Sequence, residues 1–123
     1  MRKILIVDDS AVVRGRLTQL LAALPEMEIV GEAQDAKGGR ELSGKLKPDV
    51  IIIDVQMRGG IDLLQHIKRM DSAPHVIVST NEAYPEIRNR CLAAGADYFF
   101  DKSTEYEEMV AVLKRTPVRS GSH

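Results

Sequence analysis

The sequence has little of what marks an exported or membrane protein. Its single cysteine, Cys91, has no second cysteine with which to form an intramolecular disulfide, so an oxidising compartment is not implied. No run of apolar residues exceeds five, which excludes a membrane-spanning helix and the core of a signal peptide. We therefore expect no membrane association and a cytoplasmic location.

The sequence also lacks an excess of charge of either sign. It has 17 basic and 18 acidic residues, for a net charge of −1, whereas nucleic-acid binders usually carry a basic face. Direct nucleic-acid binding is therefore not expected. Neither His66 nor His75 has a cysteine or histidine at ligand spacing, so a zinc site is not expected either.

What the sequence does have is the composition and pattern of one folded domain. Of its 123 residues, 44% are hydrophobic and 28% are charged, as in globular proteins. Apolar runs of strand length alternate with segments of helical period. This alternation predicts the α/β class, a doubly wound five-stranded parallel sheet with helices on both faces. The expected strands are Ile4–Val7, Glu28–Ala33, Val50–Ile53, Val76–Val78 and Tyr98–Phe100.

Cap and breaker residues set the expected helix limits. Asp9 or Ser10 can cap the first helix, and Thr104 with Glu107 fits a capping box for the last. The segment 36–47 contains three glycines, each costing about 1 kcal/mol relative to alanine in a helix. We expect only a short, poorly stable helix there.

The sequence thus predicts one domain over residues 1–116. Residues 117–123 lack periodicity, and we expect a disordered tail there.

Polar residues follow the expected strands at the point where each one ends. Because parallel strands present their carboxyl ends at one edge of the sheet, these residues should converge. Adjacent carboxylates repel by roughly 1 kcal/mol in water and about 4 kcal/mol at a protein surface, and a divalent cation would relieve that repulsion. Oxygen ligands with few carboxylates favour Mg²⁺. The residues at this edge are Asp8, Asp9, Asp54, Ser79, Thr80, Asp101 and Lys102.

Four short motifs in this order resemble a known family. They are D-D after the first strand, D-V-Q-M after the third, V-S-T after the fourth and A-G-A-D-Y-F-F-D-K around the fifth. Together they resemble bacterial response-regulator receiver domains of two-component systems, over residues 3 to about 115. The resemblance implies the flavodoxin-like strand order 2-1-3-4-5.

The resemblance also implies roles for individual residues. Asp54 matches the phosphoryl acceptor, a nucleophilic role known for carboxylates. Asp9 and Asp54 match ligands of Mg²⁺, with Asp8 assisting through water and the backbone carbonyl of Gln56 as a further ligand. Lys102 matches the amine that pairs with the incoming phosphoryl oxygens.

Other positions match residues that transmit or tune the signal. Ser79 matches the hydroxyl that swings toward the phosphoryl group, and Phe99 matches the aromatic side chain that follows it. Gln56 and Asn81 match positions that tune hydrolysis of the acyl phosphate. The signal would leave through the face formed by the fourth helix, the fifth strand and the fifth helix.

The family further implies partners for the chain. The donor would be a sensor histidine kinase or a histidine phosphotransfer protein, and the output a downstream protein target. A dimer linked to phosphorylation is left open. The chain would act as a phosphoacceptor rather than an enzyme, with auto-dephosphorylation at most.

The sequence departs from the family pattern at three points. Arg58, where proline is usual, follows Met57, and the loop from Asp54 to Ile61 is shorter than the common pattern. Ser103 replaces the proline that often follows the lysine in a cis bond. A cis bond without proline costs about 2.5–4 kcal/mol, so the Lys102–Ser103 bond could be trans or strained.

Alternative functions remain open at this point. The altered loop at Arg58 is compatible with a pseudo-receiver, a binding module that is never phosphorylated. A Mg²⁺-dependent phosphatase using Asp54 or Asp8 is less well supported, because the D-x-D spacing of that chemistry is absent. A dinucleotide-binding domain ranks last, since no G-x-G-x-x-G follows the first strand. The leading hypothesis is a single-domain receiver, or the receiver part of a longer regulator.

Overall fold

A parallel sheet forms the centre of the computed structural model, which describes residues 1–117. Within these residues the sheet has five strands in the order β2-β1-β3-β4-β5. The predicted α/β class and the flavodoxin-like order are therefore confirmed. The strands are β1 (Arg2–Val7), β2 (Met27–Ala33), β3 (Val50–Ile53), β4 (His75–Thr80) and β5 (Tyr98–Asp101).

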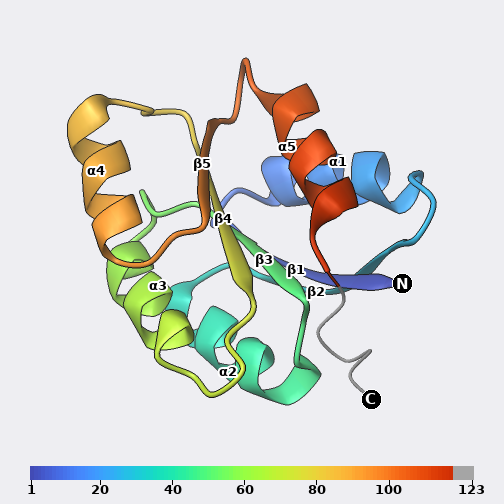
Figure 1. Cartoon of the computed structure of the whole chain (residues 1–123), viewed down its shortest axis with the longest axis horizontal. Helices are drawn as coiled ribbons and strands as arrows, with labels where there is room; N and C mark the ends of the chain where they lie inside the picture. The colour runs from blue at the N-terminus through green and yellow to red at the C-terminus, as the bar shows by residue number, and fades with distance from the viewer. Residues whose placement is uncertain (118–123) are drawn as a thin grey trace.

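Helices cover both faces of the sheet, as Figure 1 shows. One face carries α1 (Ala11–Ala22) and α5 (Tyr106–Arg115). The opposite face carries α2 (Ala36–Leu46), α3 (Gly60–Lys68) and α4 (Pro85–Ala93). This doubly wound arrangement follows from parallel strands, each of which needs a crossover helix.

Alternate strand residues supply the two layers of the core. In β1, Ile4 and Ile6 pack toward α1 and α5, whereas Leu5 and Val7 pack toward α2 and α3. All four residues of β3 are buried, as expected for a central parallel strand that is apolar on both faces. The same alternation fixes the direction of the polar residues that follow each strand.

Two of the expected helix starts have different outcomes. Ser10 caps α1, since its Oγ accepts a hydrogen bond from the Val13 amide at 3.2 Å. The capping box at Thr104 is wrong, because Glu105 occupies the N-cap position of α5. The reason lies in the preceding loop: the Asp101 carboxylate accepts hydrogen bonds from Ser103, and the Glu105 carboxylate turns back to the Asp101 amide at 2.8 Å.

The helix expected over 36–47 is present as Ala36–Leu46, but it is not short. Helix α2 has 11 residues, against nine in α3 and nine in α4. A Cβ at Gly39 would lie 2.8 Å from Leu63 and 3.0 Å from Val7, so this glycine lets α2 approach the sheet and α3 closely. This close packing stabilises α2 despite the low helix propensity of glycine.

The first strand and the last helix are joined at the amino edge of the sheet. The Arg2 guanidinium donates to the carbonyl oxygens of Thr116 and Lys114, at 2.7 and 2.6 Å. A cation is favourable at a helix C-terminus, where carbonyl groups lack partners within the helix. Of the expected tail, 118–123 lies outside the described residues.

None of the helices in residues 1–117 is both long and apolar enough to cross a membrane.

A pair of glycine substitutions tests how tightly the loop after β3 is packed. A Cβ at Gly60 would lie 2.6 Å from the Val55 Cα and 2.7 Å from its carbonyl oxygen. We expect Gly60→Ala to lower the free energy of unfolding by about 1–3 kcal/mol, as overpacking does. Gly44→Ala, which places its Cβ in open space on α2, should raise it by about 0.5–1 kcal/mol. Urea unfolding of both variants measures the difference, and equal effects would contradict the packing at Gly60.

Candidate functional site

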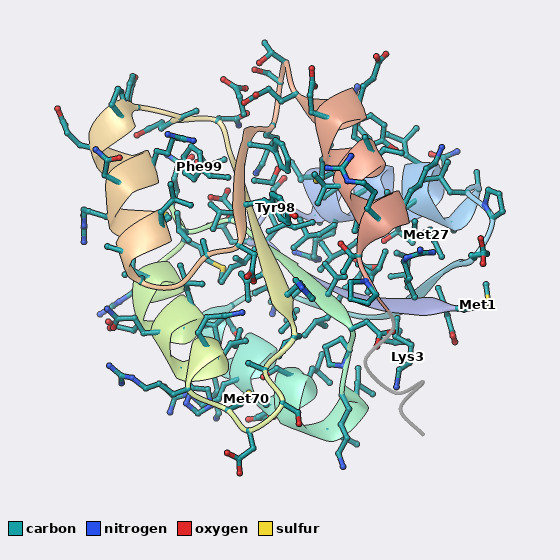
Figure 2. All side chains as sticks on the ribbon, in the orientation of Figure 1. Met1, Lys3, Met27, Met70, Tyr98 and Phe99 are labelled. Atoms are coloured by element: carbon teal, nitrogen blue, oxygen red, sulfur yellow. The ribbon has the colours of Figure 1, made fainter. Side chains whose placement is uncertain are left out.

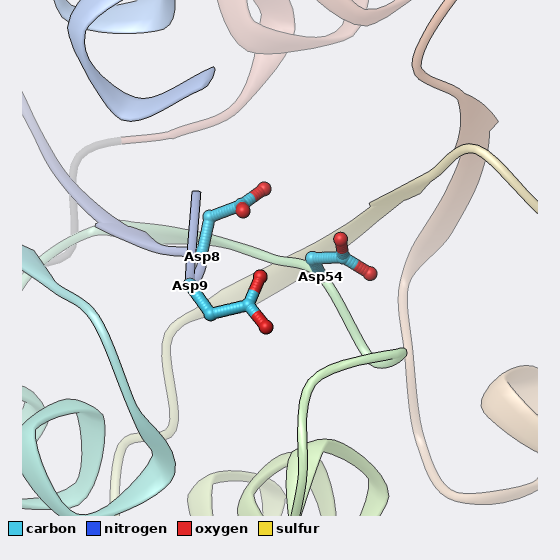
Figure 3. A group of neighbouring side chains, drawn as sticks. All are labelled: Asp8, Asp9 and Asp54. Atoms are coloured by element: carbon cyan, nitrogen blue, oxygen red, sulfur yellow. The ribbon is translucent and has the colours of Figure 1, made fainter. Parts of the chain in front are cut away.

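Three carboxylates gather at the carboxyl edge of the sheet. Asp8 and Asp9 follow β1 directly, and Asp54 follows the neighbouring strand β3. One carboxylate oxygen of each lies within 4.8 Å of the others, and Figure 3 shows the three side chains side by side. Asp8 and Asp54 are only 3% and 8% exposed, whereas Asp9 is exposed. The convergence expected from the strand ends is therefore present.

Lys102 brings a positive charge into this cluster from the loop after β5. Its Nζ lies 2.8 Å from Asp8 Oδ2 and 2.9 Å from Asp54 Oδ2. Burial lowers the pKa of Lys102, but the hydrogen bonds and charges of Asp54 and Asp8 outweigh burial and raise this pKa above its ordinary value. The Lys102–Ser103 peptide bond is trans, and the ammonium reaches both carboxylates from this conformation.

The second oxygen of each buried carboxylate also accepts a hydrogen bond. Asp8 Oδ1 accepts a hydrogen bond from the Ser10 amide, and Asp54 Oδ1 accepts one from the Gln56 amide, each at 2.9 Å. Fixed oxygens of this kind make a preorganised site. Asp9, by contrast, faces solvent and is free to adjust to a ligand.

The charge and chemistry of this cluster fit a divalent cation. Three carboxylates and one ammonium leave two net negative charges, which one divalent ion would neutralise. Mg²⁺ binds oxygen ligands at about 2.1 Å, so opposite ligands are about 4.2 Å apart. The three carboxylate oxygens lie within 4.8 Å of one another, close to that range. Asp9, Asp54 and Asp8 could therefore hold the ion, together with water and the Gln56 carbonyl.

Strand alternation orders the other predicted residues around the carboxylates. Ile77 on β4 packs toward α1 and α5, so Ser79, two residues on, projects toward the same side as Asp54. Phe99 lies on the opposite side of β5, packed against the core beneath α4; Figure 2 shows it on the side of β5 that faces α4. Asn81 is exposed and lines, together with Lys102, an open cavity of about 310 Å³ beside α1 and α5.

The loop after Asp54 forms a tight turn. Gly59 has a φ of 76°, and the Gly60 amide donates to the Met57 carbonyl at 3.0 Å. Met57 is buried, and Arg58 and Gln56 are exposed. The Gln56 side chain accepts a hydrogen bond from the Thr80 hydroxyl on β4, so two strand ends are linked beside the acidic cluster.

Sequence reasoning missed one residue that supports the site. Arg14 donates from Nη1 to the Asp8 carbonyl at 2.7 Å, and its Nε lies 3.3 Å from Glu32. It therefore ties the β1–α1 corner to β2. The available signal was its position in the first turn of α1, directly after the corner that carries Asp8 and Asp9.

Comparisons with known proteins agree with this geometry. The family model for the response regulator receiver domain matches residues 4–114. A protein-glutamate methylesterase/protein-glutamine glutaminase from Bordetella pertussis is 40% identical over 129 aligned positions, covering 96% of this chain and 37% of that protein. The chain spans about a third of the length of the curated relatives it matches.

Solved structures with this fold include two receiver domains. The response regulator domain of Thermotoga maritima CheB superposes with a TM-score of 0.85 at 29% identity, covering 94% of this chain and 96% of that one. The REC domain of RcsB from Salmonella enterica, solved with phosphomimetic BeF3−, gives a TM-score of 0.82 at 26% identity over 93% and 88%. Family model, fold and acidic cluster agree, and the chain belongs to the response regulator receiver domains of two-component signalling systems.

Proposed function

We propose that this receiver domain accepts one phosphoryl group on Asp54 in the presence of Mg²⁺. The observation that carries the proposal is the Lys102 ammonium, which bonds Asp8 and Asp54 at once while Asp9 completes the acidic cluster. This arrangement supplies a nucleophile, ligands for a cation and a fixed positive charge within one small volume. Such positioned charges are what phosphoryl transfer requires.

The chemistry of the transfer follows from these positions. A carboxylate oxygen of Asp54 bonds to the phosphorus of the donor, and the bond from phosphorus to the leaving group breaks with its electron pair. Lys102 exchanges its bond to Asp54 for one to the phosphoryl oxygens. Asp9, Asp54 and Asp8 would hold the Mg²⁺, which would offset the negative charge of the phosphoryl group.

We further propose that the output is the face formed by α4, β5 and α5. Ser79 would follow the phosphoryl group. Phe99 projects to the opposite face of the sheet, beneath α4, so its repacking would have to be passed on through the end of β4. Tyr98 is exposed on β5 and its ring lies 6.2 Å from that of Phe100. Exposed aromatic rings of this kind favour contact with a protein partner.

The curated relatives suggest which partners to test. Because they are named as methylesterases and the chain spans about a third of their length, we propose that residues 1–116 are the regulatory unit of such a protein. The phosphoryl group would come from a sensor histidine kinase or a histidine phosphotransfer protein. The receiver would then not be the enzyme itself, and a methylesterase domain would be its downstream target.

Incubation with a small phosphodonor tests the proposal. With acetyl phosphate and Mg²⁺, we expect intact mass spectrometry to find one added phosphoryl group, and none when EDTA replaces Mg²⁺. Hydroxylamine should remove the group, because it cleaves acyl phosphates and leaves serine phosphate intact. A chain that stays unmodified under all conditions would instead be a pseudo-receiver, acting through binding alone.

A further inference from the structure

Arg14 links the corner of the acidic cluster to the edge strand β2. Its Nη1 donates to the Asp8 carbonyl oxygen at 2.7 Å, and its Nε lies 3.3 Å from Glu32 Oε1. The other oxygen of Glu32 accepts a hydrogen bond from the Thr18 hydroxyl at 3.2 Å. The Arg14 side chain is only 15% exposed. One guanidinium therefore contacts a main-chain oxygen beside the cluster and a carboxylate on the strand next to it.

The carbonyl that Arg14 contacts belongs to the peptide group between Asp8 and Asp9. A peptide group is planar and rigid, so a hydrogen bond to its oxygen restricts the direction in which the chain continues to Asp9. The amide on the other side of Asp8 is also fixed, because it donates to the Ala33 carbonyl on β2 at 3.0 Å. The Asp9 side chain can rotate, but these contacts place the main chain from which it extends.

The position of Asp9 matters because Mg²⁺ requires a regular arrangement of ligands. The ion takes near-octahedral oxygen ligands at about 2.0–2.1 Å. Asp8 and Asp54 are buried, and each is bonded to Lys102 and to a backbone amide. Asp9 is the exposed member of the cluster. Of the three carboxylates, it is the one whose place at the ion depends most on the main chain.

We propose that Arg14 is a positioning residue of the Mg²⁺ site, which fixes the main chain at Asp9 so that its carboxylate meets the ion together with Asp54. This inference rests on the proposed function, since it concerns the cation of that proposal. Replacing a residue that orients a metal ligand commonly lowers the affinity for the metal by about 10–100-fold. Arg14 would thus favour cation binding although it is itself a cation.

Charge and position predict opposite effects for the replacement of Arg14. If charge alone acts, removing a positive charge near three carboxylates should strengthen the binding of a divalent cation. If the position of Asp9 decides, losing the hydrogen bond to the Asp8 carbonyl should weaken it. We expect Arg14→Met to raise the Kd for Mg²⁺ about tenfold, measured by following backbone amide resonances during titration with Mg²⁺. An unchanged or lowered Kd would overturn the proposal.

A charge-balanced double variant removes the remaining contribution of charge. Arg14→Met combined with Glu32→Gln has the net charge of wild type and should still raise the Kd about tenfold. Arg16→Met is the matched control, because Arg16 is an exposed arginine on the same helix, and this variant should not raise the Kd. A wild-type Kd in the double variant would contradict the proposal, as would an equal rise in Arg16→Met.

The metal-free protein gives a readout that does not depend on binding. The Asp9 amide belongs to the same peptide group as the Asp8 carbonyl, so its resonance should shift in Arg14→Met. The resonances of β3 should stay in place and report a folded sheet. An unshifted Asp9 amide would count against the proposal. A lower free energy of unfolding together with a wild-type Kd would show that Arg14 acts on the fold alone, which also overturns it.

Failure of the proposed function has a different signature. If wild type binds no Mg²⁺, the cation of the proposed function is rejected, and the role of Arg14 is rejected with it. If wild type binds Mg²⁺ and takes up a phosphoryl group from acetyl phosphate while Arg14→Met keeps the wild-type Kd, only the role of Arg14 is rejected.

Discussion

Phosphoryl uptake should fall to zero when Asp54 is replaced by asparagine. The amide has the shape of the carboxylate but lacks its negative charge and its nucleophilic oxygen. Its oxygen can still accept from the Gln56 amide, as Asp54 Oδ1 does at 2.9 Å, so the loop should keep its form. Incubation with acetyl phosphate and Mg²⁺, followed by intact mass spectrometry, should show one added group in wild type and none in Asp54→Asn.

A matched control is a carboxylate outside the acidic cluster. Asp71 is exposed and precedes β4, at the opposite edge of the sheet from Asp54. Asp71→Asn should take up one group as wild type does. A hydroxylamine-sensitive group on Asp54→Asn would identify a different acceptor, and the exposed Asp9 would then be the first candidate.

Removing the Lys102 ammonium should have the largest effect on stability. Lys102→Met leaves Asp8 and Asp54, whose side chains are 4% and 10% exposed, facing each other without the cation between them. Breaking a buried ion pair from one side costs about 3–5 kcal/mol. We expect a loss of this size in the free energy of unfolding at pH 7, measured with urea, and loss of phosphoryl uptake as well.

The sign of the pH dependence gives a second test of this cluster. The carboxylates raise the pKa of Lys102 above that in the unfolded chain. Their stabilisation is therefore fully present below the unfolded pKa of about 10.4 and is lost as pH rises through the folded pKa. The free energy of unfolding of Lys102→Met should not show this decrease at alkaline pH.

Two further variants serve as controls for Lys102. Lys102→Arg keeps a cation and should lose less stability than Lys102→Met. Lys37→Met, at a lysine on α2, should stay within about 0.5 kcal/mol of wild type. A loss below about 1 kcal/mol in Lys102→Met would place the ammonium among ordinary surface charges and contradict its organising role.

The sequence predicts those parts of the fold that depend on local pattern. Val50–Ile53 has only apolar, β-branched residues and is indeed the central strand β3. The start of α5 was misplaced because contacts between Asp101, Ser103 and Glu105 compete with the expected capping box. The length of α2 was underestimated because propensity treats Gly39 as a cost, whereas packing against Leu63 requires a residue without a Cβ.

The candidate site was partly predictable for a different reason. Parallel strands end at one edge, so Asp8, Asp9, Asp54 and Lys102 could be brought together from their positions after the strands alone. Their chemical roles stay predictions. The bond from Thr80 to Gln56 joins residues 24 positions apart, and its existence depends on how the short loop turns, which no periodicity reveals.

The two contacts of Arg2 have a mechanical consequence. Its guanidinium donates hydrogen bonds to two main-chain oxygens at the end of α5. The C-terminus of that helix is therefore anchored to β1. The curated relatives are about three times as long as this chain. In any protein that continues past Thr116, these two hydrogen bonds would fix the position and direction in which the following polypeptide leaves the sheet.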